Sequence, residues 1–268
     1  MYKFGFIGVG NMGGAIAEAV SKSVSPERII LEDAFAEKAQ QLAKKLGCSC
    51  GDNTDVAKNA QYIVLGVKPQ MMNGLLENIK GILEKRTDRF VLVTMAAGKN
   101  ISYYEDILGE EYPIIRIMPN MPVSIGMGTT VYGTNGKVTE AENAEFSAAM
   151  EKSGIVEQIP EQLIDAASAV SGCGPAFVYM FAESLADGAV KCGLPRDKAI
   201  KLAAQTIMGA GAMVLESGRH PGQLKDAVCS PAGSTIEGVK ALEEGAFRGT
   251  AMNAVKKAYK RTLELGKK

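Results

Sequence analysis

The sequence predicts an α/β protein built from two domains, a doubly wound sheet domain over residues 1–160 and an all-helical domain over residues 161–268. Three observations predict this fold class. Short apolar runs alternate with helical patterns over the first part of the chain. Strand patterns stop after Pro160. A chain of 268 residues is also long enough for two domains of ordinary size.

Seven short apolar runs in the first domain have the composition of buried strands. They span residues 3–8, 28–33, 62–66, 90–95, 114–118, 129–132 and 155–158. Helical patterns lie between them and begin near Asn11, Ala36, Thr54, Pro69, Ser102 and Thr139. Pro69 suits a first helical turn because its missing N–H would have no partner there. This alternation predicts a doubly wound sheet.

The second domain shows helical patterns only. We expect helices over 175–191 and 196–217, a short helix after Pro221, another from about Ser234, and a last one over 249–265. In 176–190 the only residues that are not apolar are Glu183, Ser184, Asp187 and Gly188. A helix that is apolar on nearly every side must be covered on every side. A small helical domain offers limited cover, so we predict that a partner subunit supplies the rest.

The charge balance argues against two classes of partner. Thirty Lys and Arg residues match 30 Asp and Glu residues, so we expect neither a nucleic-acid partner nor an anionic membrane surface. The chain begins without the pattern of a secretory signal. The uncharged apolar stretch 202–215 is shorter than the roughly 18 residues of a spanning helix. We therefore expect a soluble, cytoplasmic protein.

Cysteine and histidine usage predicts no metal site. The five cysteines are scattered, and the Cys48–Cys50 pair has no nearby histidine or further cysteine. The single histidine, His220, adjoins Pro221 where a helix is expected to begin, and we interpret it as structural.

A Gly-rich turn joins the first apolar run to the first helical pattern. Gly8 permits the tight turn, Gly10 lets the backbone approach a pyrophosphate, and Gly13 permits close packing of helix and strand. The helix start supplies N–H donors and a partial positive charge. A strand before the turn and a helix after it are the context that a Rossmann-type dinucleotide-binding domain requires. Asn11 and Met12, within the turn, complete the first set of candidate cofactor contacts.

Asp33 ends the second predicted strand, about 20 residues after Gly13. An acid at this place hydrogen-bonds the adenosine ribose hydroxyls of NAD. A 2′-phosphate there would meet both Glu32 and Asp33, with no basic residue before Lys38. The sequence therefore predicts NADH or NADPH as the cofactor, with NADH preferred. The alternative is that Asp33 only caps the following helix.

Further candidate cofactor contacts follow neighbouring strands at the same edge of the sheet. They are Asn53, Val67, Lys68, Pro69 and Ala97. In an open α/β sheet, ligands lie across the carboxyl ends of the strands. Lys68 has two open interpretations, neutralisation of a cofactor phosphate or a plain solvated side chain.

The loop 230–235 is the most informative part of the helical domain. Ser234 with Glu237 has the spacing of a capping box, so we expect a helix to begin there. Ser230, Ser234 and Thr235 then place hydroxyls beside free backbone N–H groups, which suits a small carboxylate. The alternative is a well-capped helix and nothing more.

Taken together, the motifs resemble those of the pyrroline-5-carboxylate reductase family. They are Gly-Val-Gly-Asn-Met-Gly at 8–13, Val-Lys-Pro at 67–69, Met-Pro-Asn-Met-Pro at 118–122, Ser-Gly-Cys-Gly-Pro-Ala at 171–176 and Ser-Pro-Ala-Gly-Ser-Thr at 230–235. The resemblance runs over essentially the whole chain in the same order. Three departures stand out: Ala232 replaces a glycine, Ala227 an asparagine that is often near the cofactor, and Cys173 a serine.

The resemblance implies an NAD(P)H-dependent oxidoreductase that reduces Δ1-pyrroline-5-carboxylate to L-proline, the last step of proline biosynthesis. It implies that the substrate carboxylate lies on Ser230 and the N–H groups of Ser234 and Thr235. The Thr235 hydroxyl would be the catalytic group, beside the ring nitrogen. It also implies an all-helical dimerisation domain and a homodimer or a ring of dimers, such as a decamer.

The absence of an obvious proton donor in the helical domain agrees with this chemistry. A carbonyl reductase needs a proton donor for the developing alkoxide, whereas a cyclic imine that arrives protonated does not. Enzymes of the β-hydroxyacid dehydrogenase type carry a catalytic lysine followed by asparagine, and residues 174–179 contain neither. Two more functions stay open, a non-catalytic NAD-binding sensor and a reductase of the six-membered imine. The extra methylene is worth only about 1–3 kcal/mol, so the sequence does not separate the two ring sizes.

Overall fold

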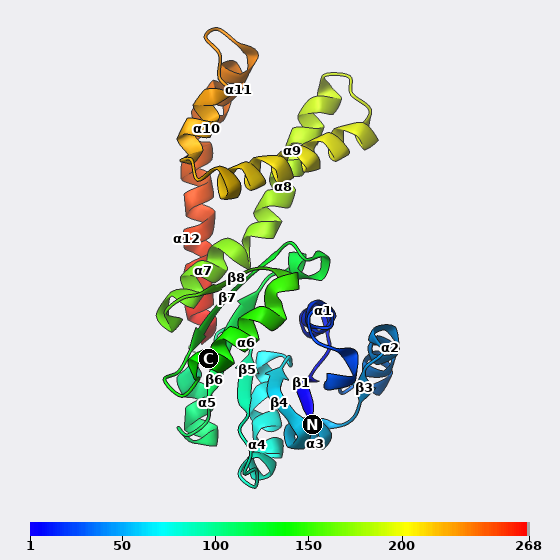
Figure 1. Ribbon diagram of the computed structural model, residues 1–268. Helices are drawn as coiled ribbons and strands as arrows, with labels where there is room; N and C mark the ends of the chain where they lie inside the picture. The colour runs from blue at the N-terminus through cyan, green and yellow to red at the C-terminus, as the bar shows by residue number, and fades with distance from the viewer. Residues whose placement is uncertain (267–268) are drawn as a thin grey trace. The chain divides into compact units, whose positions relative to one another are not determined.

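The computed structural model describes residues 1–266, which form two compact units (Figure 1). The first unit contains residues 1–173 together with the end of the chain from Ala258, and the second contains Gly174–Lys257. Helix α12 (Phe247–Gly266) therefore contributes to both units.

The first unit is built on one eight-stranded sheet in the order β3-β2-β1-β4-β5-β6-β7-β8. The strands are β1 (Tyr2–Ile7), β2 (Ile29–Glu32), β3 (Ser49–Cys50), β4 (Ala60–Leu65), β5 (Val91–Thr94), β6 (Ile114–Pro119), β7 (Gly128–Thr134) and β8 (Gly154–Gln158). All neighbours are parallel except the pair β6 and β7. The chain changes direction across the sheet between β1 and β4, which creates a crevice at their carboxyl ends.

Helices cover both faces of this sheet (Figure 1). On one face α1 (Asn11–Val20), α2 (Ala36–Leu46) and α6 (Glu140–Met150) pack over apolar residues that include Phe4, Leu31 and Val93. On the other face lie α3 (Asn53–Asn59), α4 (Met72–Leu83) and α5 (Ile101–Leu108), over residues that include Ile30 and Leu92. The alternation along each strand produces these two cores, because successive side chains point to opposite faces.

Helix α7 (Ile164–Ser171) packs on the far end of the sheet, where Ile164 joins Met118 and Val131 in a small core. A short turn at Gly172 and Cys173 leads from there into the second unit. The Gly172 and Cys173 N–H groups both donate to the Ser168 carbonyl, at 2.8 and 3.0 Å.

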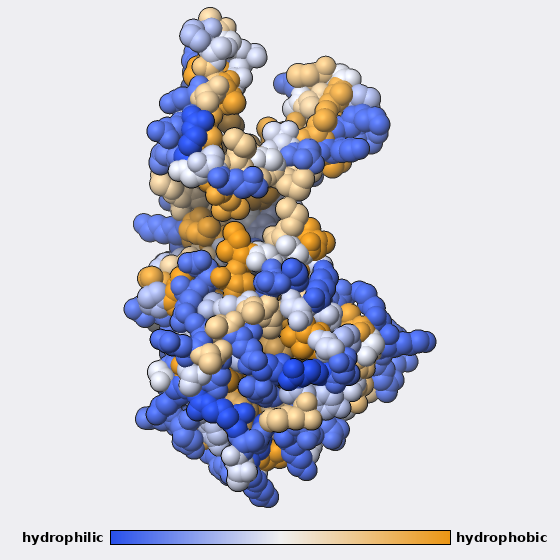
Figure 2. All heavy atoms as spheres, viewed as in Figure 1, coloured by the Kyte–Doolittle hydropathy of each residue, from blue (hydrophilic) through white to orange (hydrophobic). Residues whose placement is uncertain are grey.

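The second unit contains α8 (Gly174–Lys191), α9 (Arg196–Ser217), α10 (Pro221–Ala227), α11 (Ser234–Glu244) and the start of α12. Helices α8 and α9 pack through a small alanine cluster of Ala186, Ala199 and Ala203. Much of the apolar surface on these helices stays exposed, as Figure 2 shows. Met180, for instance, is 68% exposed. Residues 1–266 therefore leave much of the apolar surface of α8 uncovered.

The predicted fold class is confirmed, and most elements lie within two or three residues of their expected bounds. The two-residue strand β3, helix α7 and several short 3₁₀ helices were not predicted. Within residues 1–266, one helical stretch, Glu161–Lys191, is long and apolar enough to cross a membrane, judged by its length and composition alone. That stretch combines α7 and α8, which belong to different compact units.

Candidate active site

Three glycines meet where the β1–α1 turn crosses the residues after β4. A Cβ on Gly13 would lie 2.1 Å from the Gly8 carbonyl oxygen, and one on Gly66 would lie 2.3 Å from the same atom. Gly8 has a φ of +93°, a conformation that side chains rarely adopt. Its N–H donates to the Glu32 carbonyl at 2.9 Å, and the Gly66 N–H donates to the Ile7 carbonyl at 2.7 Å. The glycines therefore allow the β1–α1 turn to pack directly on the residues after β4.

The start of α1 is open to a ligand. Gly10 precedes the first helical residue, Asn11, and within the described chain no side chain caps this helix end. No described atom lies within 4 Å of a Cβ built on Gly10. Asn11 is exposed, and Met12 is half-buried against the core. The first N–H groups of a helix have no partner within the helix. This turn is thus a cradle that fits a pyrophosphate.

The Asp33 side chain ties the Gly-rich turn to the turn after β2. Its Oδ2 accepts the Val9 N–H at 2.9 Å, and its Oδ1 accepts the Phe35 N–H at 3.0 Å. Residue 35 precedes α2, and no described side chain caps the start of that helix. The carboxylate therefore stands at the carboxyl end of β2 beside the cradle, as the sequence predicts.

The remaining predicted cofactor residues lie at the carboxyl ends of neighbouring strands. Asn53 is the first residue of α3, and its buried Oδ1 has no hydrogen-bond partner within residues 1–266. A cavity of about 320 Å³ is lined by Asn53 together with Val67 and Glu32. Lys68 is exposed and precedes Pro69, the first residue of a short 3₁₀ turn. An unpartnered amide beside an apolar cavity fits an adenosine.

Ala97 is exposed in the turn after β5, next to buried Ala96. The end of α12 packs against this turn, because a Cβ on Gly98 would lie 3.1 Å from the Gly266 Cα. Beneath it, Glu161 accepts the Ile101 N–H at the start of α5 and pairs with buried Arg116. Arg116 also pairs with Asp165 at 2.6 Å. These bonds fix the turn that carries Ala97.

The sequence pattern does not single out Arg116, because its partners follow it by 45 and 49 positions. Asn120 also has no separate role in the predicted site. The Asn120 side chain accepts the Thr129 N–H and donates to the Ser171 carbonyl, both at 2.9 Å. It thereby links the end of β6 to the end of α7. The feature of the sequence that could have marked Asn120 is its place at the centre of the Met-Pro-Asn-Met-Pro motif.

The predicted carboxylate loop lies in the second unit, between α10 and α11. A turn closes it, with the Gly233 N–H donating to the Ser230 carbonyl at 3.0 Å. Ala232 has a φ of +55°, in the left-handed region that favours glycine. A Cβ on Gly233 would lie 2.3 Å from Ser230 Oγ, so only glycine leaves this hydroxyl its position. The loop brings Ser230 close to the start of α11.

The expected capping box at Ser234 is wrong. Gly233, with extended backbone angles, precedes α11, and Ser234 is already the first helical residue. In the described chain no side chain caps this end. The spacing of serine and glutamate fits either position, and the turn at 230–233 decides between them. With Gly233 as the cap, the N–H groups of Ser234 and Thr235 lie in the first turn of α11 and are open to a ligand.

His220 caps α10, because its Nδ1 accepts the Gly222 N–H at 3.1 Å. This fits the structural role expected of it. Among residues 1–266, no group of three His, Cys, Asp or Glu side chains is placed to hold a metal ion.

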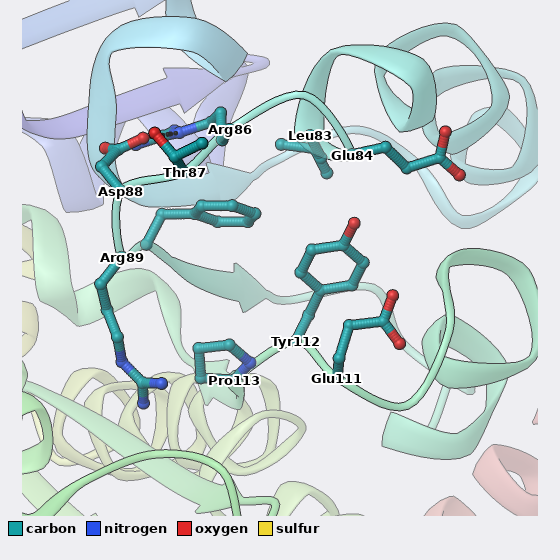
Figure 3. A pocket seen from close by; sticks show the side chains of 10 residues that line it. Leu83, Glu84, Arg86, Thr87, Asp88, Arg89, Glu111, Tyr112 and Pro113 are labelled. Atoms are coloured by element: carbon teal, nitrogen blue, oxygen red, sulfur yellow. Dashed lines mark hydrogen bonds and ion pairs between the residues drawn. The ribbon is translucent and has the colours of Figure 1, made fainter.

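A separate cavity of about 450 Å³ lies at the amino ends of β5 and β6, away from the crevice (Figure 3). Its walls include Phe90 and Tyr112, whose rings are 5.4 Å apart. Arg86 beside them pairs with Asp88 and donates to the Ala57 and Ala60 carbonyls. The guanidinium is already satisfied by the protein, so this cavity is not a candidate active site.

Comparisons with known proteins extend over the whole chain. Residues 161–265 match the model described as pyrroline-5-carboxylate reductase dimerisation. Residues 3–98 match the model described as NADP oxidoreductase coenzyme F420-dependent.

Two curated relatives carry the name pyrroline-5-carboxylate reductase. The one from Methanosarcina acetivorans is 39% identical, covering 99% of this chain and 98% of its own length. The one from Escherichia coli is 40% identical, with the same coverage. A solved structure of the Coxiella burnetii reductase has a TM-score of 0.91 and 32% identity, covering 98% of both chains. The Plasmodium falciparum reductase, solved with NADP bound, has a TM-score of 0.87 and 34% identity, covering 99% of this chain and 98% of its own. The chain belongs to the pyrroline-5-carboxylate reductase family.

Proposed function

We infer that this protein reduces Δ1-pyrroline-5-carboxylate to L-proline by hydride transfer from NAD(P)H, the last step of proline biosynthesis. The full-length match to curated reductases carries this inference. Two features of the structure support it, the cradle in the β1–α1 turn and the uncapped start of α11, because the reaction needs a dinucleotide site and a carboxylate site.

The chemistry asks little of acid–base groups. The nicotinamide supplies the hydride when it is bound. The imine carbon receives it, and the π electrons move to a nitrogen that already carries its proton, which gives the secondary amine. The single histidine of the chain, His220, is engaged in capping α10. Orientation of the ring is therefore the main contribution of the protein.

We assign the substrate carboxylate to Ser230 and to the N–H groups of Ser234 and Thr235. Two observations support this. Helix α11 begins there without a side-chain cap in the described chain, and its first acidic residue is Glu237. A helix start of this kind attracts an anion. The Thr235 hydroxyl is assigned to the ring nitrogen.

We assign the cofactor to residues at the carboxyl edge of the sheet in the first unit. They are Gly8, Gly10, Asn11, Met12, Gly13, Asp33, Asn53, Val67, Lys68, Pro69 and Ala97. The unpartnered Oδ1 of Asn53 and the open space over Gly10 support this assignment.

NADH is the preferred cofactor in this proposal. Asp33 is held beside the cradle by two backbone N–H groups, and its charge would face a 2′-phosphate. The Plasmodium falciparum relative was solved with NADP, so the two acids at residues 32 and 33 are the reason to expect a different preference here. In Asp33→Ser, we expect the specificity constant for NADPH to rise relative to that for NADH. An unchanged ratio would remove Asp33 as a determinant.

The helical domain is proposed to form a homodimer, and the dimers a ring. We propose a domain boundary at 160/161, where the strand patterns stop, and the start of the dimerisation match at residue 161 supports it. In the apolar window of Glu161–Lys191 only 17% of residues are buried, so a partner helix has much surface to cover. We assign this surface to a second subunit rather than to a membrane, and the protein to the cytoplasm. Light scattering at micromolar concentration tests this, and a monomer would contradict it.

The test of function is a steady-state assay of pyrroline-5-carboxylate reduction with NADH and with NADPH, followed by detection of proline. The six-membered imine acid serves as the comparison substrate. A higher specificity constant for the six-membered ring would reassign the substrate while leaving the reaction type intact.

A further inference from the structure

Glu32, the last residue of β2, lies on a different face of the sheet from the aspartate that follows it in sequence. Along β2, Leu31 packs with the core under α1 and α2, whereas Ile30 packs with the core under α3 and α4. Strand alternation puts Glu32 on the same face as Ile30. Its side chain accordingly lines the cavity that Asn53 and Val67 also line.

The surroundings of Glu32 are acidic or neutral. Burial, and then the charges of Asp33 and Asp52, raise the pKa of Glu32 to about 7, against an opposing hydrogen bond from the Gly8 backbone. Asp52 belongs to the start of α3, where it accepts the Asp55 N–H. Cys50 of β3 is also close, and burial raises the pKa of its thiol, so it stays neutral near pH 7. Glu32 therefore changes charge in the range where enzymes are ordinarily assayed.

We propose that Glu32 is a second specificity-determining residue for the cofactor, and that its proton makes discrimination against NADPH depend on pH. The inference deepens the proposed function, since it rests on an adenosine occupying the edge between Glu32 and Asp33. Asp33 supplies a carboxylate from the turn beside the cradle. Glu32 adds a charge from the adjoining cavity only when it is ionised.

The direction of the effect follows from linkage. A 2′-phosphate near Glu32 opposes its ionisation, so NADPH binds better to the protonated form. Protonated Glu32 predominates below about pH 7 and is lost above it. NADPH should therefore be tolerated best at low pH, and discrimination in favour of NADH should grow as the pH rises. NADH has no 2′-phosphate and should respond far less.

The experiment measures the ratio of specificity constants, NADPH over NADH, from pH 6.0 to 8.5 in the wild type and in Glu32→Gln. The 2′-phosphate itself titrates near pH 6, and this contribution is present in both proteins. We expect the wild-type ratio to fall with rising pH by roughly tenfold more than the variant ratio, as one like-charge contact would give. Equal slopes in the two proteins would overturn the proposal.

Two controls separate this inference from the proposed function. Glu84→Gln removes one exposed carboxylate at the opposite edge of the sheet and should keep the wild-type slope. Calorimetric affinities of NADP⁺ and NAD⁺ at pH 6.0 and 8.5 give the same comparison without turnover. If the wild type prefers NADPH at every pH but Glu32→Gln still flattens the slope, the NADH preference fails and the role of Glu32 stands. If the wild type prefers NADH and its slope equals that of Glu32→Gln, the NADH preference stands and the proposed role of Glu32 fails.

Discussion

The three-glycine crossing allows a matched pair of substitutions, Gly13→Ala and Gly10→Ala, that separates packing from cofactor binding. On this backbone a Cβ at Gly13 would lie 2.1 Å from the Gly8 carbonyl oxygen, so helix and strand must move apart by about 1 Å. Overpacking of this kind costs about 1–3 kcal/mol. For a unit of this size, that corresponds to a fall of about 2–10 °C in Tm.

Gly10→Ala should behave in the opposite way. Its Cβ meets no described atom within 4 Å, and its φ of −63° suits alanine. We expect Tm to stay within about 2 °C of the wild type, because nothing in the fold is displaced. The methyl group would instead occupy the space assigned to the pyrophosphate, and we expect the Kd of NADH to rise tenfold or more, about 1.4 kcal/mol. Thermal unfolding and calorimetric titration measure the two effects. Wild-type affinity for NADH in Gly10→Ala would refute the placement of the cofactor.

Three further predictions concern the carboxylate loop and one ion pair. Thr235→Ala should lower kcat by roughly 10–100-fold with little change in cofactor affinity, because a hydroxyl bonded to a charged group contributes about 1.5–3 kcal/mol; unchanged kinetics would remove Thr235 from the mechanism. Ala232→Gly should raise the free energy of unfolding by up to about 1 kcal/mol, since Ala232 has a φ of +55°. The same exchange at Ala241, inside α11, should lower it. A fall at Ala232 would contradict the strained turn. The hydrogen bond from Arg89 lowers the pKa of Glu142 to about 2. The contribution of this pair to the free energy of unfolding is therefore complete above about pH 4.5 and is lost as the pH falls towards 2. The stability difference between wild type and Arg89→Met should therefore shrink on acidification, and a constant difference by denaturant unfolding would count against the pair.

The sequence predicts the sheet domain well because its signals are local. Strand 2–7 is mostly apolar, three glycines mark the turn into the first helix, and Asp33 directly follows the next strand, so each element carries its own pattern. Strand β3 was not predicted because it is two residues long, too short to show a period. Helix α7 is eight residues long and is followed directly by Gly-Cys-Gly, which has the composition of a loop.

The parts of the site that were not predicted depend on contacts distant in sequence. The Asp33 carboxylate accepts a bond from Val9, 24 positions earlier, which no pattern along the chain indicates. The pKa of Glu32 depends first on burial and then on the charges of Asp33 and Asp52, and neither the burial nor the approach of Asp52 is indicated by the sequence. The start of α11 depends on a turn that gives Gly233 its extended backbone. In each case the residue type was visible in the sequence, and its partner was not.

The steady-state reduction of Δ1-pyrroline-5-carboxylate by the purified full-length protein, with NADH and NADPH compared at the same pH, tests substrate and cofactor together. We expect formation of proline, with a higher specificity constant for NADH at pH 8. Binding of NADH without any oxidation in the presence of this substrate would contradict the proposed function.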